Sequence, residues 1–137
     1  VISSSTGFGS FSSVGNLPGS IGSVTVDGSG SIWDIKSNAA IGEMGTGTLT
    51  IQNGGAVISG DTGFGGFSGV GSDADSIGMV TVDGDGSTWD VREKLWVGSE
   101  GDGTLTIQNG GAVSHPNDAN IGSEGNGRVI VDGSGST

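Results

Sequence analysis

The sequence predicts an all-β fold in which short strands stack into a parallel β-helix, also called a β-solenoid. Three observations support this prediction. The 137-residue chain repeats itself, with Val24 recurring as Val80 and Trp33 as Trp89. A shorter unit lies inside that repeat, and each unit holds three short apolar stretches separated by turn-forming residues. No segment carries an apolar spacing of useful length that would indicate a helix.

The long repeat divides the chain into two copies, 1–56 and 57–112, and a shorter third copy, 113–137. The stretch "GTLTIQNGGAV" occurs letter for letter in both full copies, from Gly47 and again from Gly103. Because the pattern runs through the whole chain, we expect residues 1–137 to form a single solenoid. The chain begins and ends inside a repeat, so we also expect it to be a segment of a longer protein.

The shorter unit is marked by one motif in two versions, "VTVDG" and "LTIQNG". Successive copies start 24 or 25 residues apart, apart from one longer step with an insertion around "TGFGGFSGVGSDADS". This spacing predicts about five rungs. The motif starts at Val24, Leu49, Val80, Leu105 and Val129.

Each rung is expected to supply three short strands. The apolar stretches are rich in β-branched residues, and Gly, Asp, Asn and Ser separate them. In a parallel β-helix each strand pairs with its equivalent one rung away, about 4.8 Å distant. A β-sandwich also has many short strands, but it does not require the same triplet in every unit. The stretches lie at 24–26, 33–35 and 39–41, and at 80–82, 89–91 and 95–97.

The two outer residues of each V-T-V or L-T-I triplet share one face of the strand, and the threonine points the other way. A threonine ladder resembles the hydroxyl rows of ice-binding surfaces. That function needs more than one hydroxyl per strand, and Ile130 interrupts the row, so we favour exposed strand positions as the explanation. The predicted outward ladder is Thr25, Thr50, Thr81 and Thr106. The predicted inward columns are Val24, Val26, Leu49, Ile51, Val80, Val82, Leu105, Ile107, Val129 and Val131.

An Asp-Gly or Asn-Gly pair follows the first strand of every rung. These residues tolerate the left-handed backbone that a corner between strands requires, and their side chains could stack as a ladder. Calcium binding is the alternative, but the glycine-aspartate nonapeptide of calcium β-rolls is absent. We therefore predict structural corners and no metal site. The pairs begin at Asp27, Asn53, Asp83, Asn109 and Asp132.

Aromatic residues supply the candidate binding site. All four phenylalanines fall in the inserted stretches "TGFGSFS" and "TGFGGFS", which we expect to form loops that lie above one another. Trp96 replaces Ala40 of the preceding copy and is expected to be partly exposed. These aromatic residues could form a contact surface, or the phenylalanines could fold back over the edge of the solenoid. The candidates are Phe8, Phe11, Phe64, Phe67 and Trp96.

Trp33 and Trp89 occupy matching positions in "GSGSxWD". They could form a carbohydrate-binding platform. We favour a core-facing or groove-filling role, because Ile35 and Val91 share their phase along the strand.

Charge and composition exclude several function classes. The net charge of -11, with only four Lys and Arg residues, opposes binding to nucleic acid or to anionic lipid surfaces. The absence of cysteine excludes disulfides and thiol chemistry. His115 lies in a turn-like stretch without an evident catalytic partner. We expect Lys36, Arg92, Lys94 and Arg128 not to recur at positions that gather them with acids, so we predict no enzyme and no cofactor.

The segments "VTVDGxGSxWD", "LWVGSEGDGTLTIQNGGAV" and "IGSEG" resemble the repeat of bacterial autotransporter (type V secretion) passenger domains and PEP-CTERM proteins. The resemblance covers nearly the whole chain. It implies a right-handed β-solenoid from a Gram-negative bacterium, exposed at the cell surface or secreted. It also implies contact with the membrane only through a β-barrel domain that this sequence does not contain, and it offers no catalytic residues.

The resemblance implies adhesion or biofilm formation. We therefore expect a structural or adhesive passenger segment whose partner is a ligand on a host or neighbouring cell, or another copy of itself. Open strand edges at the ends of the stack would favour such self-association. The alternative is a carbohydrate-binding or carbohydrate-processing β-helix.

Overall fold

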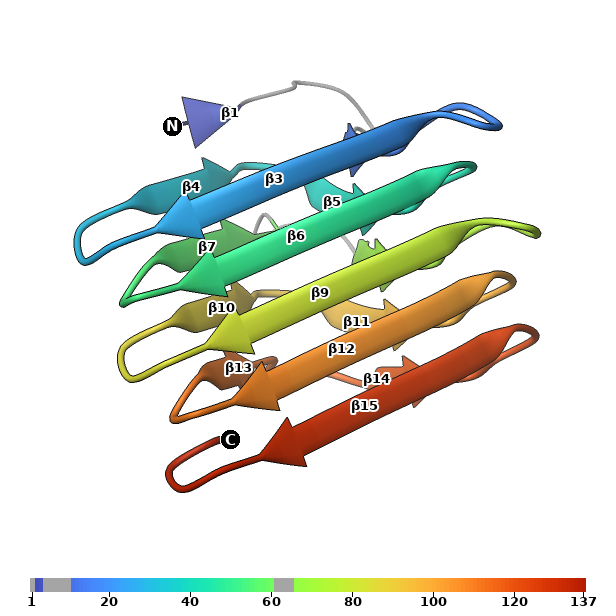
Figure 1. The fold of residues 1–137 in the computed structure, drawn as a ribbon. Helices are drawn as coiled ribbons and strands as arrows, with labels where there is room; N and C mark the ends of the chain where they lie inside the picture. The colour runs from blue at the N-terminus through green and yellow to red at the C-terminus, as the bar shows by residue number, and fades with distance from the viewer. Residues whose placement is uncertain (1, 4–10, 61–65) are drawn as a thin grey trace.

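The computed structural model describes residues 2–3, 11–60 and 66–137, and within these ranges it contains β-strands and no helix. The strands form three sheets of five, and every pairing within them is parallel. Successive strands belong to different sheets, and every third strand returns to the same sheet (Figure 1). This arrangement confirms the predicted β-solenoid with three strands per rung and five rungs.

The three sheets, here named A, B and C, have the following strands. Sheet A contains β1 (Ile2–Ser3), β4 (Ile32–Ile35), β7 (Ala56–Ser59), β10 (Thr88–Val91) and β13 (Ala112–Ser114). Sheet B contains β2 (Phe11–Val14), β5 (Asn38–Ile41), β8 (Phe67–Val70), β11 (Lys94–Val97) and β14 (Ala119–Ile121). Sheet C contains β3 (Ile21–Asp27), β6 (Thr46–Gln52), β9 (Ile77–Asp83), β12 (Asp102–Gln108) and β15 (Asn126–Asp132).

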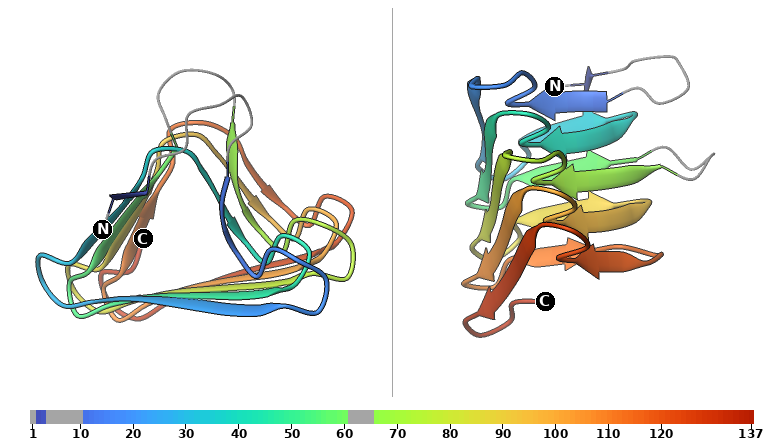
Figure 2. Two further views of the ribbon diagram at one scale, coloured as in Figure 1. Left: turned by 90° about the horizontal axis from the view of Figure 1, so that it is seen from above. Right: turned by 90° about the vertical axis from the view of Figure 1, so that its right-hand side faces the viewer.

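The sheets form the three sides of a triangular coil, and sheet C is its longest side (Figure 2). Seen from the end that holds the N-terminus, the chain runs clockwise as it recedes, so the coil is right-handed (Figure 2). This is the hand that parallel crossover connections almost always adopt. It also agrees with the hand implied by the resemblance.

The strands of sheet C are longer than the predicted triplets, with seven residues each. Their first half contains an inward-facing glycine, which lies outside the predicted triplet. A side chain at Gly47 would overlap backbone atoms of Gly42 and Val14, because the turn between sheets B and C folds back against the strand. Glycine therefore allows a close backbone approach here. The column in register is Gly22, Gly47, Gly78, Gly103 and Gly127.

The inward columns of sheet C have the predicted register. Val24 is level with Leu49, then with Val80, Leu105 and Val129. Most members of both columns are buried in one continuous apolar core. Val24 and Val129 are half-buried, and Val131 is exposed over 56% of its surface in the last rung. A rung buries its inner face only against its neighbours, so each aliphatic side chain stabilises the stack by about 1.5–3 kcal/mol where it is fully covered.

The two tryptophans at matching repeat positions of sheet A face the core, as predicted. Trp89 is fully buried, and its Nε1 donates a hydrogen bond to Ser59 Oγ at 3.0 Å. Ser59 Oγ lies 2.9 Å from Ser68 Oγ in sheet B, so this polar group is satisfied inside the coil. Trp33 is half-buried and packs against the same core.

The corner between sheets C and A has the predicted left-handed backbone. Asn53 and Asn109 both have a φ of 53°, and the glycines after them have φ values of 82° and 89°. The last residues of the five sheet C strands stack in register, with acids and amides alternating, and we call this row the corner ladder. Its members are Asp27, Gln52, Asp83, Gln108 and Asp132.

The asparagines connect neighbouring rungs of the corner ladder. Asn53 Nδ2 donates to Asp27 Oδ1 at 2.8 Å, and Asn109 Nδ2 donates to Asp83 Oδ1 at 2.7 Å. Gln52 Nε2 donates to the second oxygen of Asp27 at 3.1 Å. The hydrogen bonds from Asn53 and Gln52 lower the pKa of the exposed Asp27 carboxyl. The two versions of the motif are therefore complementary, because each amide rung supplies donors to an acidic rung.

Candidate functional site

Three of the predicted binding residues lie together on the outer face of sheet B, where we call them the aromatic ladder. Phe11 is on β2, Phe67 on β8 and Trp96 on β11. The rings of Phe11 and Phe67 meet edge to face, with centroids 5.6 Å apart and planes at 63°. The rings of Phe67 and Trp96 are stacked, with centroids 4.4 Å apart and planes at 16°. All three side chains are half-buried.

Strand alternation places these rings outside the coil. The last residue of each of these strands, Val14, Val70 and Val97, is buried in the core. Because successive side chains point to opposite faces, positions one and three residues earlier point outward. Phe11 and Phe67 occupy the earlier of these positions, and Trp96 occupies the later one.

The prediction that Phe11 and Phe67 lie in inserted loops is wrong. Both residues open strands, and the sequences "FSSV" and "FSGV" are complete strands of sheet B. The glycines around the phenylalanines suggest loops, and they mask the short period-two alternation inside. The other two candidates, Phe8 and Phe64, lie outside the described residues, so their predicted role is not tested.

Small side chains make room for the aromatic ladder. Trp96 is in register with Gly69, which is in register with Ala40 on the other side. Gly69 presents no side chain, so the indole of Trp96 reaches Phe67 on the neighbouring strand. Sequence reasoning missed Gly69 as part of this site. Aligning strands β5, β8 and β11 of sheet B reveals this role, because Trp96 then lies opposite Gly69.

The Trp96 indole contains an unusual polar atom. Its Nε1 is buried and has no hydrogen-bond partner within the described ranges. The buried indole of Trp89, by contrast, donates to Ser59. An unsatisfied buried donor is unfavourable by about 1–3 kcal/mol, so this nitrogen offsets part of the stability that the stacked ring adds.

The outer face of sheet C is the other broad surface. The four threonines form the predicted column in register, ended by Ile130. β6 has more than one outward hydroxyl, since Thr46 and Thr48 alternate with buried positions. Ile77 and Met79 occupy the corresponding positions on β9 and are 42% and 41% exposed. The hydroxyl array is therefore interrupted, as an ice-binding surface would not be.

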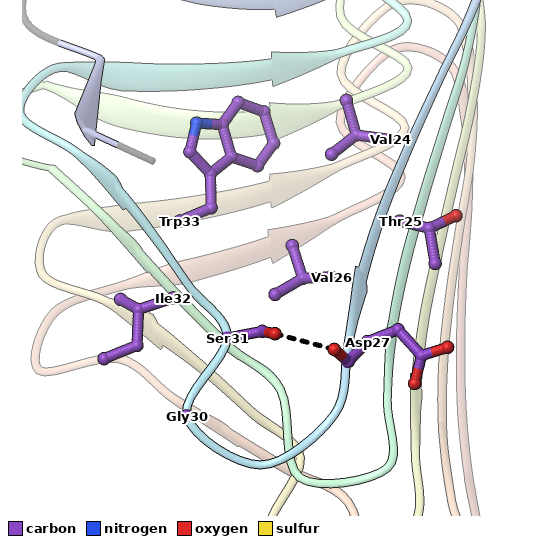
Figure 3. A pocket seen from close by; sticks show the side chains of 8 residues that line it. All are labelled: Val24, Thr25, Val26, Asp27, Gly30, Ser31, Ile32 and Trp33. Atoms are coloured by element: carbon purple, nitrogen blue, oxygen red, sulfur yellow. Dashed lines mark hydrogen bonds between the residues drawn. The ribbon is translucent and has the colours of Figure 1, made fainter.

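A pocket lies at the inner side of the first complete rung, between β3 and β4 (Figure 3). Trp33, Val24 and Val26 point into it, and Ser31 donates to the Asp27 carbonyl across its rim at 2.7 Å (Figure 3). The equivalents of Val24 and Val26 one rung further, Leu49 and Ile51, are fully buried. The pocket is therefore lined by members of the core columns and holds no distinct set of catalytic groups.

The expectation that the cationic residues do not recur beside acids is wrong for two of them. Lys36 pairs with Asp34, and Arg92 Nε lies 3.3 Å from Asp90 Oδ2 at the equivalent place in the next copy. Both pairs are partly exposed, and each contributes about 0–1 kcal/mol to stability. His115 is exposed, and its Nδ1 lies 2.9 Å from the carbonyl oxygen of Asn117.

The described part of the chain contains no group of three or more His, Cys, Asp or Glu residues that could hold a metal ion. It also contains no helix long and apolar enough to cross a membrane.

Comparison with known proteins finds relatives in bacterial envelope proteins. Over 99 residues the chain is 35% identical to the adhesin BmaC autotransporter of Brucella suis biovar 1 (strain 1330), covering 72% of this chain and 3% of that protein. Over 123 residues it is 33% identical to the uncharacterized lipoprotein YdeK of Escherichia coli (strain K12), covering 86% of this chain and 9% of that protein. No protein-family model matches the chain, and no solved structure matches it significantly.

These matches support the coarser part of the resemblance. The chain is distantly homologous to a segment of an autotransporter adhesin, and it folds as a β-solenoid. It spans less than a tenth of the length of either relative. The resemblance to PEP-CTERM proteins stays a prediction.

Proposed function

We propose that the chain is a non-catalytic segment of a bacterial cell-surface adhesive rod and that it contacts its ligand through the outer face of sheet B. The observation that carries this proposal is the aromatic ladder of Phe11, Phe67 and Trp96 on that face. The distant homology of the chain to a protein named as an autotransporter adhesin supports the adhesive role and a place in the cell envelope.

The rod and the contact surface have different physical requirements. A solenoid holds its outer faces rigidly, so less conformational entropy is lost when the contact residues bind a partner. Aromatic side chains are enriched at binding hot spots because they bury a large area with few rotatable bonds. The high negative charge of the chain keeps rods apart, which leaves the aromatic patch on sheet B as a place for specific contact.

Bead retention tests the proposal. Beads coated with the chain are washed under flow over layers of bacterial cells and of cultured mammalian cells. We expect retention on at least one layer, and we expect Phe67→Ala and Trp96→Ala to reduce it. Met79→Ala is the matched control, since Met79 is an exposed apolar residue on sheet C. Equal retention of the Trp96→Ala and wild-type beads would contradict the role of sheet B.

Self-association is a separate outcome of the same experiment. Beads that clump with one another in the absence of any cell layer would identify a second copy of the chain as the partner. The sheet B variants then report whether that contact uses the aromatic ladder.

Carbohydrate binding is the second candidate, and the three partly exposed rings of the aromatic ladder favour it. Sugars have apolar ring faces that pack on aromatic side chains. A glycan array identifies such a ligand. No bound glycan, together with unchanged cell retention in the presence of soluble oligosaccharides, would remove this candidate and leave protein ligands.

A further inference from the structure

The corner between sheets C and A holds two Asn-Gly pairs, Asn53-Gly54 and Asn109-Gly110, in the same stretch "IQNGGA". In such a pair the backbone nitrogen of glycine can attack the side-chain carbonyl carbon (Cγ) of asparagine. The nitrogen loses its proton, ammonia leaves, and a cyclic imide forms. Water then opens the imide to aspartate or to isoaspartate, so water is the one other reactant required.

The folded corner binds the attacking nitrogen. Gly54 N donates a hydrogen bond to Ser87 Oγ at 3.0 Å, and that hydroxyl donates in turn to the Asp83 carbonyl oxygen at 2.6 Å. Ser87 is buried and belongs to the next rung. A hydrogen-bonded amide proton is harder to remove, and the nitrogen is held in place. The neighbouring rung therefore restrains the nucleophile.

The second pair has the same arrangement. Gly110 N donates to Ser136 Oγ at 3.1 Å, and Ser136 Oγ donates to the Asp132 carbonyl oxygen at 2.6 Å. The geometry thus occurs twice, 56 residues apart, with a different serine in each case.

The rung before each asparagine holds the side-chain nitrogen that must leave as ammonia. The side-chain nitrogens of Asn53 and Asn109 donate to Asp27 and Asp83 at 2.8 and 2.7 Å. Each asparagine is therefore held by the rung before it, while its glycine is held by the rung after it. Both asparagine side chains are exposed, so water reaches the imide once it forms.

We propose that Asn53 and Asn109 are sites of spontaneous deamidation, and that rung stacking suppresses the reaction through Ser87 and Ser136. When a corner opens, the glycine nitrogen is released and the imide forms. The aspartate product places a carboxylate beside Asp27 or Asp83, and the isoaspartate product lengthens the backbone by one methylene. Neither product can restore the hydrogen bond from the asparagine amide to the corner ladder. A transient opening of the corner therefore becomes a permanent change. This inference is independent of the proposed adhesive function.

Mass spectrometry of the aged chain tests the proposal with an internal control. After incubation at mildly alkaline pH, trypsin cleavage at Lys36, Arg92, Lys94 and Arg128 places the two asparagines in separate peptides, 37–92 and 95–128. Fragment sequencing then gives the deamidated fraction at each asparagine. The unstructured peptide Ile-Gln-Asn-Gly-Gly-Ala supplies the unprotected rate.

We expect both asparagines of the folded chain to react more slowly than the peptide. Ser87→Ala is expected to raise the rate at Asn53 by about fivefold or more, the factor of one neutral hydrogen bond, and to leave Asn109 unchanged. Ser136→Ala is expected to do the reverse. A wild-type rate equal to that of the peptide, or no increase in either variant, would overturn the proposal. An equal increase at both asparagines in each variant would also overturn it, since this indicates general unfolding.

Discussion

The corner between sheets C and A and the outer face of sheet B follow opposite rules. At the corner, acid and amide alternate without exception through all five rungs, from Asp27 to Asp132. On sheet B one outward position changes in every rung, and its residues are Ser13, Ala40, Gly69, Trp96 and Asn120. At the corner, Asp27 and Asp83 accept side-chain hydrogen bonds from the following rung, so the two rungs must match. The outward positions of sheet B are free to differ and to form a particular surface.

Electrostatics explains why the corner uses two versions of one motif. Identical acids directly in register would place like charges opposite one another at each step, which destabilises a sheet. Alternation places Gln52 between Asp27 and Asp83 instead. The long repeat of two rungs is therefore the smallest unit that stacks with charge separation.

The largest expected effect is a difference in the free energy of unfolding between alanine substitutions at an inward-facing and an outward-facing glycine. Gly47→Ala should destabilise the fold by about 3 kcal/mol or more, because the new methyl group would overlap backbone that cannot move away. Gly69→Ala should cost far less, since the nearest atoms belong to the side chains of Ser72 and Phe67. Urea unfolding of both variants measures the difference. Equal losses would contradict the distinction between stacking positions and the sheet B face.

Substitutions at Asn53 separate its backbone role from its side-chain role. Asn53→Gly removes the amide but tolerates the φ of 53°, whereas Asn53→Ala removes the amide and strains the backbone. We expect Asn53→Ala to be less stable than Asn53→Gly by about 1 kcal/mol. If thermal unfolding ranked the two variants in the opposite order, the left-handed corner would be excluded as the reason for asparagine at this position.

A double-mutant cycle measures the stacked pair of the aromatic ladder. Phe67→Ala, Trp96→Ala and the combined variant should give a coupling free energy of about 1 kcal/mol, which is typical of a stacked aromatic pair. Phe11→Ala in combination with Trp96→Ala is the control, since contact between those rings is indirect, through Phe67. A coupling near zero for the stacked pair would show that the rings do not stabilise each other in solution.

The smallest expected effect is a pH dependence at Asp27. Its folded-state pKa lies below the ordinary value of 3.8, so its contribution to stability is present above pH 3.8 and is lost as the pH falls through the folded pKa. Asn53→Gly should move this pKa back towards 3.8, because the amide of Asn53 is the main cause of the shift. NMR titration of the Asp27 carboxyl measures it. An unchanged pKa in the variant would contradict the hydrogen bond.

Sequence periodicity was enough to predict the architecture, the inward columns and the left-handed corners. These features depend on residues that repeat, such as Leu49, Leu105 and the Asn-Gly pairs. The aromatic ladder could be predicted only in part. Its members lie 56 and 29 positions apart in the chain, and their contact depends on strand pairing around an insertion. The hydrogen bonds from Asn53 to Asp27 and from Gly54 N to Ser87 could not be predicted either, because they join residues of adjacent rungs and leave no apolar pattern in the sequence.

Cell retention and thermal unfolding, measured together on Trp96→Ala and Asn53→Gly, test most directly whether the outer face of sheet B binds while the corners hold the fold. The account predicts that Trp96→Ala loses retention while it stays folded at the assay temperature. It predicts that Asn53→Gly unfolds at a lower temperature but retains beads as wild type does while folded. Full retention by Trp96→Ala, with retention lost only in the corner variant, would contradict it.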